Sequence, residues 1–473
     1  MTSRRDFVRA VGVAAVGAPF VRRGRYQLFP GVDTDYSARC ITLVQESIVV
    51  DMLGLLSLGP NGEKWMQDPD TFGPADLQRF RDSGITVFHP ASGTGGPNVY
   101  EQTFWFLSGF NGFIAAHTDA FTRIDSADDF ARAKRDGKIG LILGVQNSEH
   151  FRTLQDVERF YALGQRVSQL TYNSRNLFGN GSTERRDEGL SDFGVRLVGK
   201  MNDLGMAVDV SHCGDRTSLD AFEVSKRPVL ITHSNARALN PGHPRCKPDE
   251  VIRACGKAGS VMGITGVRNF VKDREPTTIE DVLNHFDYVA KMIGVEHVGI
   301  GSDIDLDGYD DMPPDEYKRL KESYKGSYAF RDKIDIEGLD HPKRMFDLTE
   351  GLIRRRYSDA DIHGILGANF VRVLGESWQR TATAPARSPA PTGADQRAPA
   401  RTSAATPSRS ASVPPDRARP RAVAHRTAAV AQGRRSRHRL PPAPRVAARS
   451  TVPGRSHSPA SSPRRCRRAG RPA

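Results

Sequence analysis

The sequence has 473 residues, of which 26% are charged and 38% hydrophobic, and its formal net charge is +13. This length suffices for one large domain or two of medium size, and no apolar run of 18 residues indicates a transmembrane helix. The charge is concentrated at the ends, because residues 381–473 carry +18 and residues 1–23 carry +4, which leaves −9 for residues 24–380. An acidic body argues against a nucleic-acid-binding core, and no specific nucleic-acid partner is expected.

Residues 1–23 have the features of an export signal. Arg4 and Arg5 are followed by Asp6, Phe7 and a mildly apolar stretch, residues 10–21. This pattern resembles a twin-arginine leader, whose short apolar segment does not anchor a protein in a membrane. We therefore expect an exported protein in the periplasm, outside the cell or at its surface. The alternative is a basic N-terminus without a targeting function.

Residues 24–380 alternate between short apolar, β-branched runs and amphipathic stretches. Eight near-continuous apolar runs predict parallel strands covered on both faces: 47–52, 85–89, 139–145, 167–172, 206–212, 229–233, 260–265 and 297–302. The stretches between them predict helices at 75–82, 153–164, 192–204, 217–225, 248–256 and 279–293, with a last helix at 359–374. Asp192 is expected to cap the helix that it begins.

Eight alternating units predict an α/β fold, the (β/α)8 or TIM-type barrel. A doubly wound sheet is the alternative, but no GxGxxG motif follows any of the predicted strands. Two long insertions, residues 91–137 and 306–345, follow the second and eighth strands. In a barrel of this kind both insertions lie over the C-terminal mouth, where they can shape a substrate site.

Residues 381–473 form a compositionally distinct tail. They contain 20 Arg, 15 Pro and a single Leu, and lack Phe, Tyr, Trp, Ile and Met. Such a segment cannot bury enough apolar area to offset its ordering entropy, so the tail is predicted to be disordered. It is either an arm for nucleic acid or anionic lipid, or a dispensable extension. The absence of aromatic residues that stack on bases favours the second interpretation.

The five cysteines form no CxxC pair and are odd in number. This excludes a disulfide framework and a cysteine-type zinc ribbon. A single Cys213–Cys246 or Cys246–Cys255 bridge stays open at this point.

Polar residues follow several of the predicted strands, where a barrel carries its functional groups. His212 and His233 end the fifth and sixth strands, and Asp303 follows the eighth. Two neutral imidazoles suit Zn²⁺, and a nearby acid can orient its bound water. The strand ends therefore predict a metal site. Other polar residues at strand ends are His89, Gln146, Glu149, His150, Tyr172 and Asn176.

The order of several motifs resembles the membrane (renal) dipeptidase family of zinc metallopeptidases. The resemblance covers roughly residues 45–376 and rests on the segments 170–176, 188–194, 206–212, 225–228, 233–239 and 298–305. It implies a (β/α)8 barrel that cleaves dipeptides at a paired zinc site, in some members with cyclic or β-lactam-like amides as further substrates. It also implies a homodimer.

Individual positions carry roles over from this resemblance. His212 and His233 match the two histidine ligands of one zinc, and Asp303 matches the acid that orients and protonates at the reaction centre. Arg245, twelve residues after His233, matches the arginine that binds the substrate carboxylate, a task that suits its forked guanidinium. Asn176 is assigned to substrate binding beside Arg245.

Other positions depart from the family pattern. Leu53 and Leu55 stand where the family has the His-x-Asp ligands of the second zinc, and leucine cannot coordinate a metal. Gln146 replaces the bridging glutamate, and Tyr172 replaces the histidine that polarises the substrate carbonyl. A phenol can still donate a hydrogen bond to an oxyanion. We therefore expect about one zinc ion per chain, with the second family site lost.

Three interpretations of the site remain. In the first, one zinc binds His212 and His233, is completed by Gln146 or Asp303 and water, and Asp303 serves as the general base. In the second, a replacement ligand comes from Glu149, His150 or His89, although a solvent-facing loop start for the first two and a satisfied strand-end histidine for the third are preferred. In the third, the barrel binds a small carboxylate through Arg245, or acts on a different amide, without dipeptidase activity.

Overall fold

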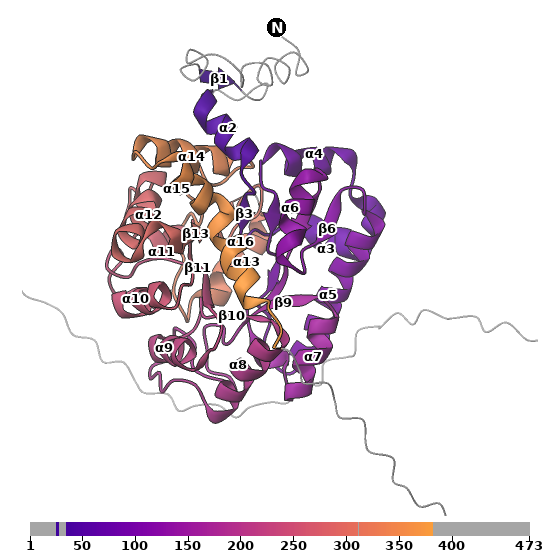
Figure 1. The fold of residues 1–473 in the computed structure, drawn as a ribbon, viewed down its shortest axis with the longest axis vertical. Helices are drawn as coiled ribbons and strands as arrows, with labels where there is room; N and C mark the ends of the chain where they lie inside the picture. The colour runs from indigo at the N-terminus through magenta and orange to yellow at the C-terminus, as the bar shows by residue number, and fades with distance from the viewer. Residues whose placement is uncertain (1–24, 28–34, 311, 382–473) are drawn as a thin grey trace, which may run out of the picture. The chain divides into compact units, whose positions relative to one another are not determined.

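The computed structural model describes residues 25–27, 35–310 and 312–381, so the predicted leader and almost all of the predicted tail lie outside the described residues. The described body is a (β/α)8 TIM-type barrel of parallel strands surrounded by helices (Figure 1), as predicted. Its strands are β3 (Val50–Asp51), β4 (Val87–Phe88), β5 (Ala91–Ser92), β7 (Ile139–Leu141), β8 (Leu143–Val145), β9 (Gln165–Gln169), β10 (Ala207–Asp209), β11 (Val229–Ser234), β12 (Met262–Ile264) and β13 (Val298–Ile300).

The strands form a ring in sequence order. Strands β8 to β13 pair in succession, and Ile300 of β13 pairs with Asp51 of β3. Strand β3 then pairs with β4, β4 with β7, and β5 with β8. β4–β5 and β7–β8 are thus two interrupted strands within single positions of the barrel. This ring brings the carboxyl ends of all the strands to one mouth.

The described helices are α2 (Ala38–Glu46), α3 (Pro60–Gln67), α4 (Pro74–Asp82), α5 (Val99–Ala116), α6 (Ala127–Arg135), α7 (Leu154–Ala162), α8 (Asp192–Leu204), α9 (Asp215–Val224), α10 (Asp249–Lys257), α11 (Arg268–Val271), α12 (Ile279–Ile293), α13 (Pro314–Tyr324), α14 (Arg344–Arg354), α15 (Asp359–His363) and α16 (Asn369–Ser377). Helices α4, α7, α8, α9, α10 and α12 match expected stretches, the expected last helix is divided between α15, the segment Gly364–Ala368 and α16, and further helices were not predicted. None of the helices in the described ranges is both long and apolar enough to cross a membrane.

One detail of the helix prediction is wrong. The cap of α8 is Ser191, whose Oγ accepts a hydrogen bond from the Gly194 N–H at 3.0 Å, and Asp192 is the first helical residue. An acid at that position still interacts favourably with the positive end of the helix dipole. The prediction is therefore wrong in the capping group, while the extent of the helix, Asp192–Leu204, equals the predicted one.

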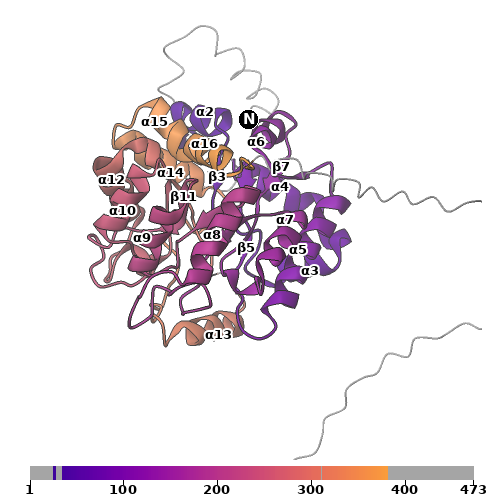
Figure 2. The same cartoon turned by 60° about the horizontal axis from the view of Figure 1, so that its bottom comes forward.

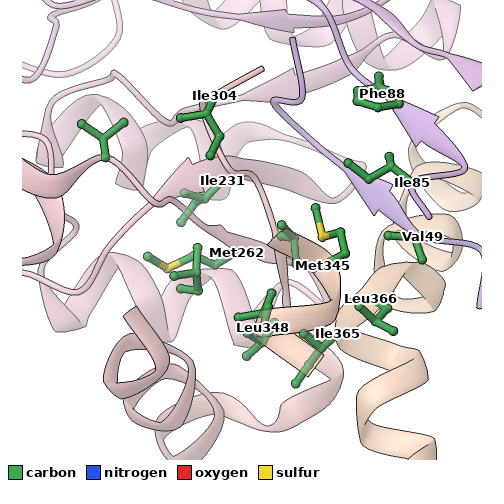
Figure 3. Close-up of a cluster of buried hydrophobic side chains, with 14 of the residues drawn as sticks. Val49, Ile85, Phe88, Ile231, Met262, Ile304, Met345, Leu348, Ile365 and Leu366 are labelled. Atoms are coloured by element: carbon green, nitrogen blue, oxygen red, sulfur yellow. The ribbon is translucent and has the colours of Figure 1, made fainter. Parts of the chain in front are cut away.

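Side chains from strands and helices far apart in the chain share one core. Figure 3 shows Met345 and Leu348 of α14 beside Met262 of β12 and Ile365 of the last helical segment, here meaning Gly364–Ala368 with α16, and all four are buried. Each fully buried side chain of this size contributes roughly 1.5–3 kcal/mol. This packing fixes α14 and the last helical segment against the barrel.

The two predicted insertions differ in content. The first, residues 91–137, contains β5, α5, α6 and a short strand, β6 (Phe121–Arg123), that pairs with β7 outside the ring. The second carries α13, and residues 312–343 are called the α13 segment below. Figure 2 shows α13 at the lower end of the barrel and α16 at the upper end. A further pair of short strands, β1 (Arg25–Gln27) and β2 (Asp35–Ser37), is antiparallel.

Cys213, Cys246 and Cys255 are buried, unpaired thiols, and Cys40 is also buried. Neither of the two bridges that the sequence left open is therefore formed. Burial raises the pKa of the Cys213 thiol to about 11, so it stays protonated at neutral pH.

Candidate active site

Two strand-end histidines face each other at the mouth of the barrel. His212 follows β10 and His233 lies near the end of β11, and their Nε2 atoms are 3.0 Å apart. Both side chains are buried, with ring centroids 5.0 Å apart and the rings tilted by 58°. The structure thus brings together the two residues that the sequence predicted as metal ligands.

Hydrogen bonds to the other ring nitrogen define the tautomer of each histidine. His212 Nδ1 lies 2.8 Å from the Asn173 amide oxygen, which only accepts, so Nδ1 carries the hydrogen. His233 Nδ1 lies 2.8 Å from Thr232 Oγ1, and the Thr232 hydroxyl donates its own hydrogen to Asp209 Oδ2 at 2.7 Å. His233 Nδ1 therefore also carries its hydrogen. Both Nε2 lone pairs consequently point at each other.

Such a pair of lone pairs fits one cation. Zinc–nitrogen bonds of about 2.0–2.1 Å in a tetrahedral site place two ligand nitrogens about 3.3 Å apart, close to the spacing observed here. Donation of the other ring N–H to an amide or hydroxyl oxygen is the usual support for a metal-binding imidazole. Burial, together with the nearby Arg245, lowers the pKa of both histidines well below the usual range. Both are thus held in the neutral form that a metal requires.

The described residues do not supply a complete set of the usual ligands. Nowhere within the described ranges do three or more His, Cys, Asp or Glu side chains lie where they could hold a metal together. Leu53 is fully buried and Leu55 partly buried, both in the segment that follows β3. The two imidazoles therefore fit one ion that takes its remaining ligands from other groups.

Asp303 lies at the same mouth with an unusual backbone. Its φ is +63°, a conformation that Asp tolerates better than most residues, and its N–H donates to the Leu53 carbonyl at 3.0 Å. The carboxylate is partly exposed and accepts no hydrogen bond from any described residue. Burial, with a contribution from Asp51 and against the effect of Arg245, raises the pKa of Asp303 to about 7. A carboxyl group with this pKa can take up and release a proton near neutral pH.

Arg245 braces the two strand ends from behind the histidines. Only 1% of its surface is exposed, and its Nη1 and Nη2 donate to the carbonyls of Ser211 at 2.5 Å and His233 at 3.1 Å. Its Nε–H finds no acceptor among the described residues. The binding of a substrate carboxylate by Arg245 stays a prediction.

Tyr172 lies against the histidine pair, and Gln146 directly follows β8. The Tyr172 ring stacks on the His212 ring, with centroids 4.0 Å apart and planes 19° apart, and its hydroxyl lies 2.6 Å from the Tyr324 hydroxyl. Burial raises the pKa of Tyr172 well above its usual value, so the hydroxyl remains a donor. Gln146 Nε2 donates to the Ala91 carbonyl at 3.1 Å, and its Oε1 accepts no hydrogen bond from the described residues.

The proposed replacement ligands after β8 are used elsewhere. Glu149 accepts hydrogen bonds from the Gly96 N–H at 3.1 Å and from the Asn147 amide at 3.2 Å, which holds the glycine-rich loop. His150 is fully buried, not solvent-facing as expected, and its two ring nitrogens lie 3.1 Å from the Asn147 carbonyl and 3.0 Å from Gln165 Oε1. In this arrangement both side chains have other hydrogen-bond partners, and a role for either as a replacement metal ligand stays a hypothesis.

Two other candidates have mixed outcomes. The Asn176 amide donates to Asn147 and to the Leu170 carbonyl and accepts from the Phe178 N–H, so it organises its own loop, and its role in substrate binding stays a prediction. His89 donates from Nδ1 to the Met52 carbonyl at 2.6 Å, but its buried Nε2 has no partner among the described residues. The expectation of a strand-end histidine with hydrogen-bonded ring nitrogens is therefore met at Nδ1 but not at Nε2.

A comparison with protein-family models decides the family. The model described as "Membrane dipeptidase (Peptidase family M19)" matches residues 61–322 and 327–388, which is more than half of the chain. The chain belongs to this membrane dipeptidase family. The family is one of metallopeptidases, and the match covers the histidine pair, Asp303 and Arg245.

Comparisons with individual proteins agree with this family assignment. An uncharacterized dipeptidase of Schizosaccharomyces pombe is 32% identical over 267 residues, which cover 54% of this chain and 57% of that protein. Dipeptidase verJ of Clonostachys rogersoniana is 32% identical over 264 residues, covering 55% and 61%. The solved structure of an amidohydrolase from Pseudomonas aeruginosa is 30% identical, with a TM-score of 0.62, and the match covers 72% of this chain and 99% of that one. The chain thus spans about three fifths of the length of these curated relatives.

The structure also shows residues at the candidate site to which the sequence analysis gave no role. Asn173 and Thr232 are each adjacent in the chain to a predicted site residue, and Asp209 ends β10. Asn173 is next to Tyr172 in the chain and Thr232 is next to His233, and this adjacency was the sequence signal that could have indicated them. Only the contacts in the structure show which polar neighbour supports an imidazole. Tyr324 and Tyr328 come from the α13 segment, and nothing in their local sequence indicates contact with β9 or its loop.

Proposed function

We propose that this protein is a metal-dependent hydrolase of dipeptides or related small amides, with about one zinc ion per chain on His212 and His233. The observation that carries the proposal is the pair of Nε2 lone pairs directed at each other across 3.0 Å. Membership of a dipeptidase family and the dipeptidase names of the relatives support the substrate class.

Each site residue has a task in this reaction. A bound metal ion supplies an activated water and polarises the scissile carbonyl. Asp303 takes the proton of the attacking water on its carboxylate and returns it to the leaving nitrogen, which suits a pKa of about 7. The Tyr172 hydroxyl donates to the carbonyl oxygen as charge develops there. Arg245 binds the carboxylate of the substrate through its Nε–H, and Gln146 Oε1 completes the ligand set.

A second function rests on the apolar replacements. Leu53 and Leu55 occupy the segment after β3, and within the described ranges no group of three or more His, Cys, Asp or Glu is placed to hold a metal. In this alternative the barrel binds a small carboxylate and does not hydrolyse dipeptides. It can equally act on a different amide. This alternative keeps Arg245 as the binding group and gives the histidines no catalytic task.

Metal content and a dipeptide panel distinguish the two functions. We expect elemental analysis of the purified chain to give about one zinc, and His212→Ala to lose both the metal and the hydrolysis of dipeptides. His341→Ala, at a half-exposed position near α14, is the matched control and should change neither. A chain without metal, whose activity survives His212→Ala, contradicts the zinc-dependent function. Two metal ions at full occupancy contradict the single site.

Export is a separate proposal, supported by the twin-arginine pattern of residues 1–23. Replacing Arg4 and Arg5 with lysine should retain the protein in the cytoplasm of an expressing bacterium, as measured by cell fractionation. An unchanged amount of secreted protein in the lysine variant would contradict export by the twin-arginine pattern.

Assembly as a homodimer, which the family resemblance implies, is likewise a proposal. Light scattering of the purified protein tests it. A mass near 52 kDa for the full-length chain, which is the mass of one copy, would contradict a dimer.

A further inference from the structure

The α13 segment reaches the histidine pair through a chain of hydrogen bonds. The Asn173 amide donates from Nδ2 to the Tyr328 hydroxyl at 3.3 Å, and its Oδ1 accepts from His212 Nδ1 at 2.8 Å. One amide therefore joins a tyrosine of the α13 segment to a histidine at the end of β10. Tyr328 lies 155 positions after Asn173 in the sequence.

A second route joins the same two parts of the barrel. The Tyr324 hydroxyl, at the end of α13, lies 2.6 Å from the Tyr172 hydroxyl. Tyr172 in turn stacks its ring on the face of His212 at 4.0 Å. Asn173 thus binds the edge of the His212 ring, and its neighbour Tyr172 packs on the face of that ring. Each of the two residues contacts a tyrosine of the α13 segment.

Both supports are themselves rigidly packed. Tyr328 is 9% exposed, and its ring packs against Phe270 at 5.2 Å and is stacked on Tyr324 at 5.5 Å. On the other side, the Asn173 carbonyl accepts hydrogen bonds from the N–H and the hydroxyl of Thr183, at 3.0 and 2.7 Å. The amide that carries His212 is therefore fixed at its backbone and at its tip.

We propose that Tyr324 and Tyr328 are positioning residues of the metal site, acting through Tyr172 and Asn173 to keep His212 Nε2 directed at His233. The proposal rests on the proposed function in taking the histidine pair as the metal-binding group. Loss of the Tyr328 hydroxyl leaves the Asn173 amide free to rotate, and loss of the Tyr324 hydroxyl removes the anchor of the stacked Tyr172 ring. Loss of such outer partners generally costs about 10–100-fold in metal affinity or activity.

Removing only the hydroxyl groups tests the proposal, because Phe preserves the ring packing. The zinc dissociation constant of the full chain, measured by competition with a chromogenic chelator and without substrate, should rise by about 10-fold or more in the Tyr324→Phe/Tyr328→Phe double variant. Tyr317→Phe is the matched control, because Tyr317 also lies on α13 but donates its hydroxyl to Asp310 and to the Asp332 carbonyl. Its zinc affinity should equal that of the wild type.

A second measurement works without metal. In the ¹⁵N-histidine-labelled apoprotein, the Nδ1–H tautomer of His212 should be resolved in the wild type and in Tyr317→Phe, and averaged between tautomers in the double variant. Unchanged zinc affinity and an unchanged His212 tautomer in the double variant overturn the proposal while the histidine site stands. A wild-type chain that binds no zinc but loses the fixed tautomer in the double variant overturns the metal function and retains the positioning of His212. Matching thermal midpoints of all variants in chelator show that the fold is preserved.

Discussion

Arg344 and Asp51 form a fully buried ion pair, with Nη2 and Oδ2 3.0 Å apart, although they are 293 positions apart in the chain. Asp51 ends β3 and Arg344 begins α14, so the pair joins the first strand of the barrel to its closing helices. The same carboxylate accepts hydrogen bonds from the Ser302 N–H at 2.8 Å and the Ser302 hydroxyl at 2.5 Å. The residue before Asp303 is therefore fixed by the first strand.

Replacing Arg344 should destabilise the protein strongly. In Arg344→Met the Asp51 carboxylate stays buried and loses the one oppositely charged partner that it has among the described residues, which generally costs about 3–5 kcal/mol. Urea unfolding followed by circular dichroism measures this loss. Arg354→Met, which removes an exposed pair with Glu280, should cost less than about 1 kcal/mol. Equal losses of the free energy of unfolding in the two variants would show that the buried ion pair stabilises the protein no more than the exposed one.

Asp303→Asn should abolish hydrolysis and stabilise the fold at the same time. Burial raises the pKa of Asp303 from its ordinary value of 3.8 to about 7, so the folded state is favoured below pH 3.8 and progressively loses that advantage as pH rises to 7. Asn keeps the left-handed backbone without the charge. The variant should gain up to about 4 kcal/mol at pH 8, reduced by the partial exposure of the side chain, and nothing at pH 3.5.

Unfolding in urea at the two pH values measures this difference. Asp305→Asn is the control, because Asp305 accepts hydrogen bonds from the backbone N–H groups of Leu58, Asp307 and Gly308 and should lose stability when replaced. A stability gain of Asp303→Asn that is equal at both pH values would contradict a raised pKa of Asp303 in the folded state.

Tyr172→Phe should separate turnover from binding. The variant keeps an aromatic ring beside His212 and loses the hydroxyl that contacts Tyr324 and is proposed to donate to the developing oxyanion, so the assay is run at saturating zinc. Removal of one such donor generally lowers kcat by about 10²–10³-fold. Steady-state kinetics on a dipeptide should therefore show a fall in kcat with little change in KM. Tyr288→Phe, which removes a hydroxyl bound to Asp249 on α10, should leave both constants unchanged. A Tyr172→Phe variant with wild-type kcat would exclude Tyr172 from charge stabilisation.

The sequence predicted the barrel because each strand is a continuous apolar run and each run ends in polar residues. The regular strands are nevertheless shorter than the runs: only Val50 and Asp51 of residues 47–52 form β3, and the run at 139–145 is interrupted at Ile142. There the partners change from β4 and β6 to β5 and β9, and this depends on the whole ring, not on the local sequence.

The site was predictable to the extent that it lies at strand ends. His212, His233 and Asp303 follow from strand order, since parallel strands bring their carboxyl ends together. Asn173 could not be separated from Asn176 in the same loop, because both are asparagines near Tyr172, and only the contact with His212 distinguishes them. The α13 segment has no sequence signal for its partners, because its contacts depend on how a long insertion folds back over the mouth.

His285 predicts acid sensitivity of the fold. Its Nδ1 accepts from the Ala236 N–H at 3.1 Å and its Nε2 donates to the Val271 carbonyl at 2.9 Å, so the neutral ring is fully satisfied. Burial lowers the pKa of His285 from 6.5 to about 4. This group's contribution to stability is therefore complete above pH 6.5 and is lost as pH falls toward 4, by up to about 3 kcal/mol. His285→Gln, which can accept and donate at the same two positions without titrating, should flatten the pH dependence of the free energy of unfolding between pH 7 and 4.5. Equal slopes in the wild type and in His285→Gln would rule out His285 as the titrating group.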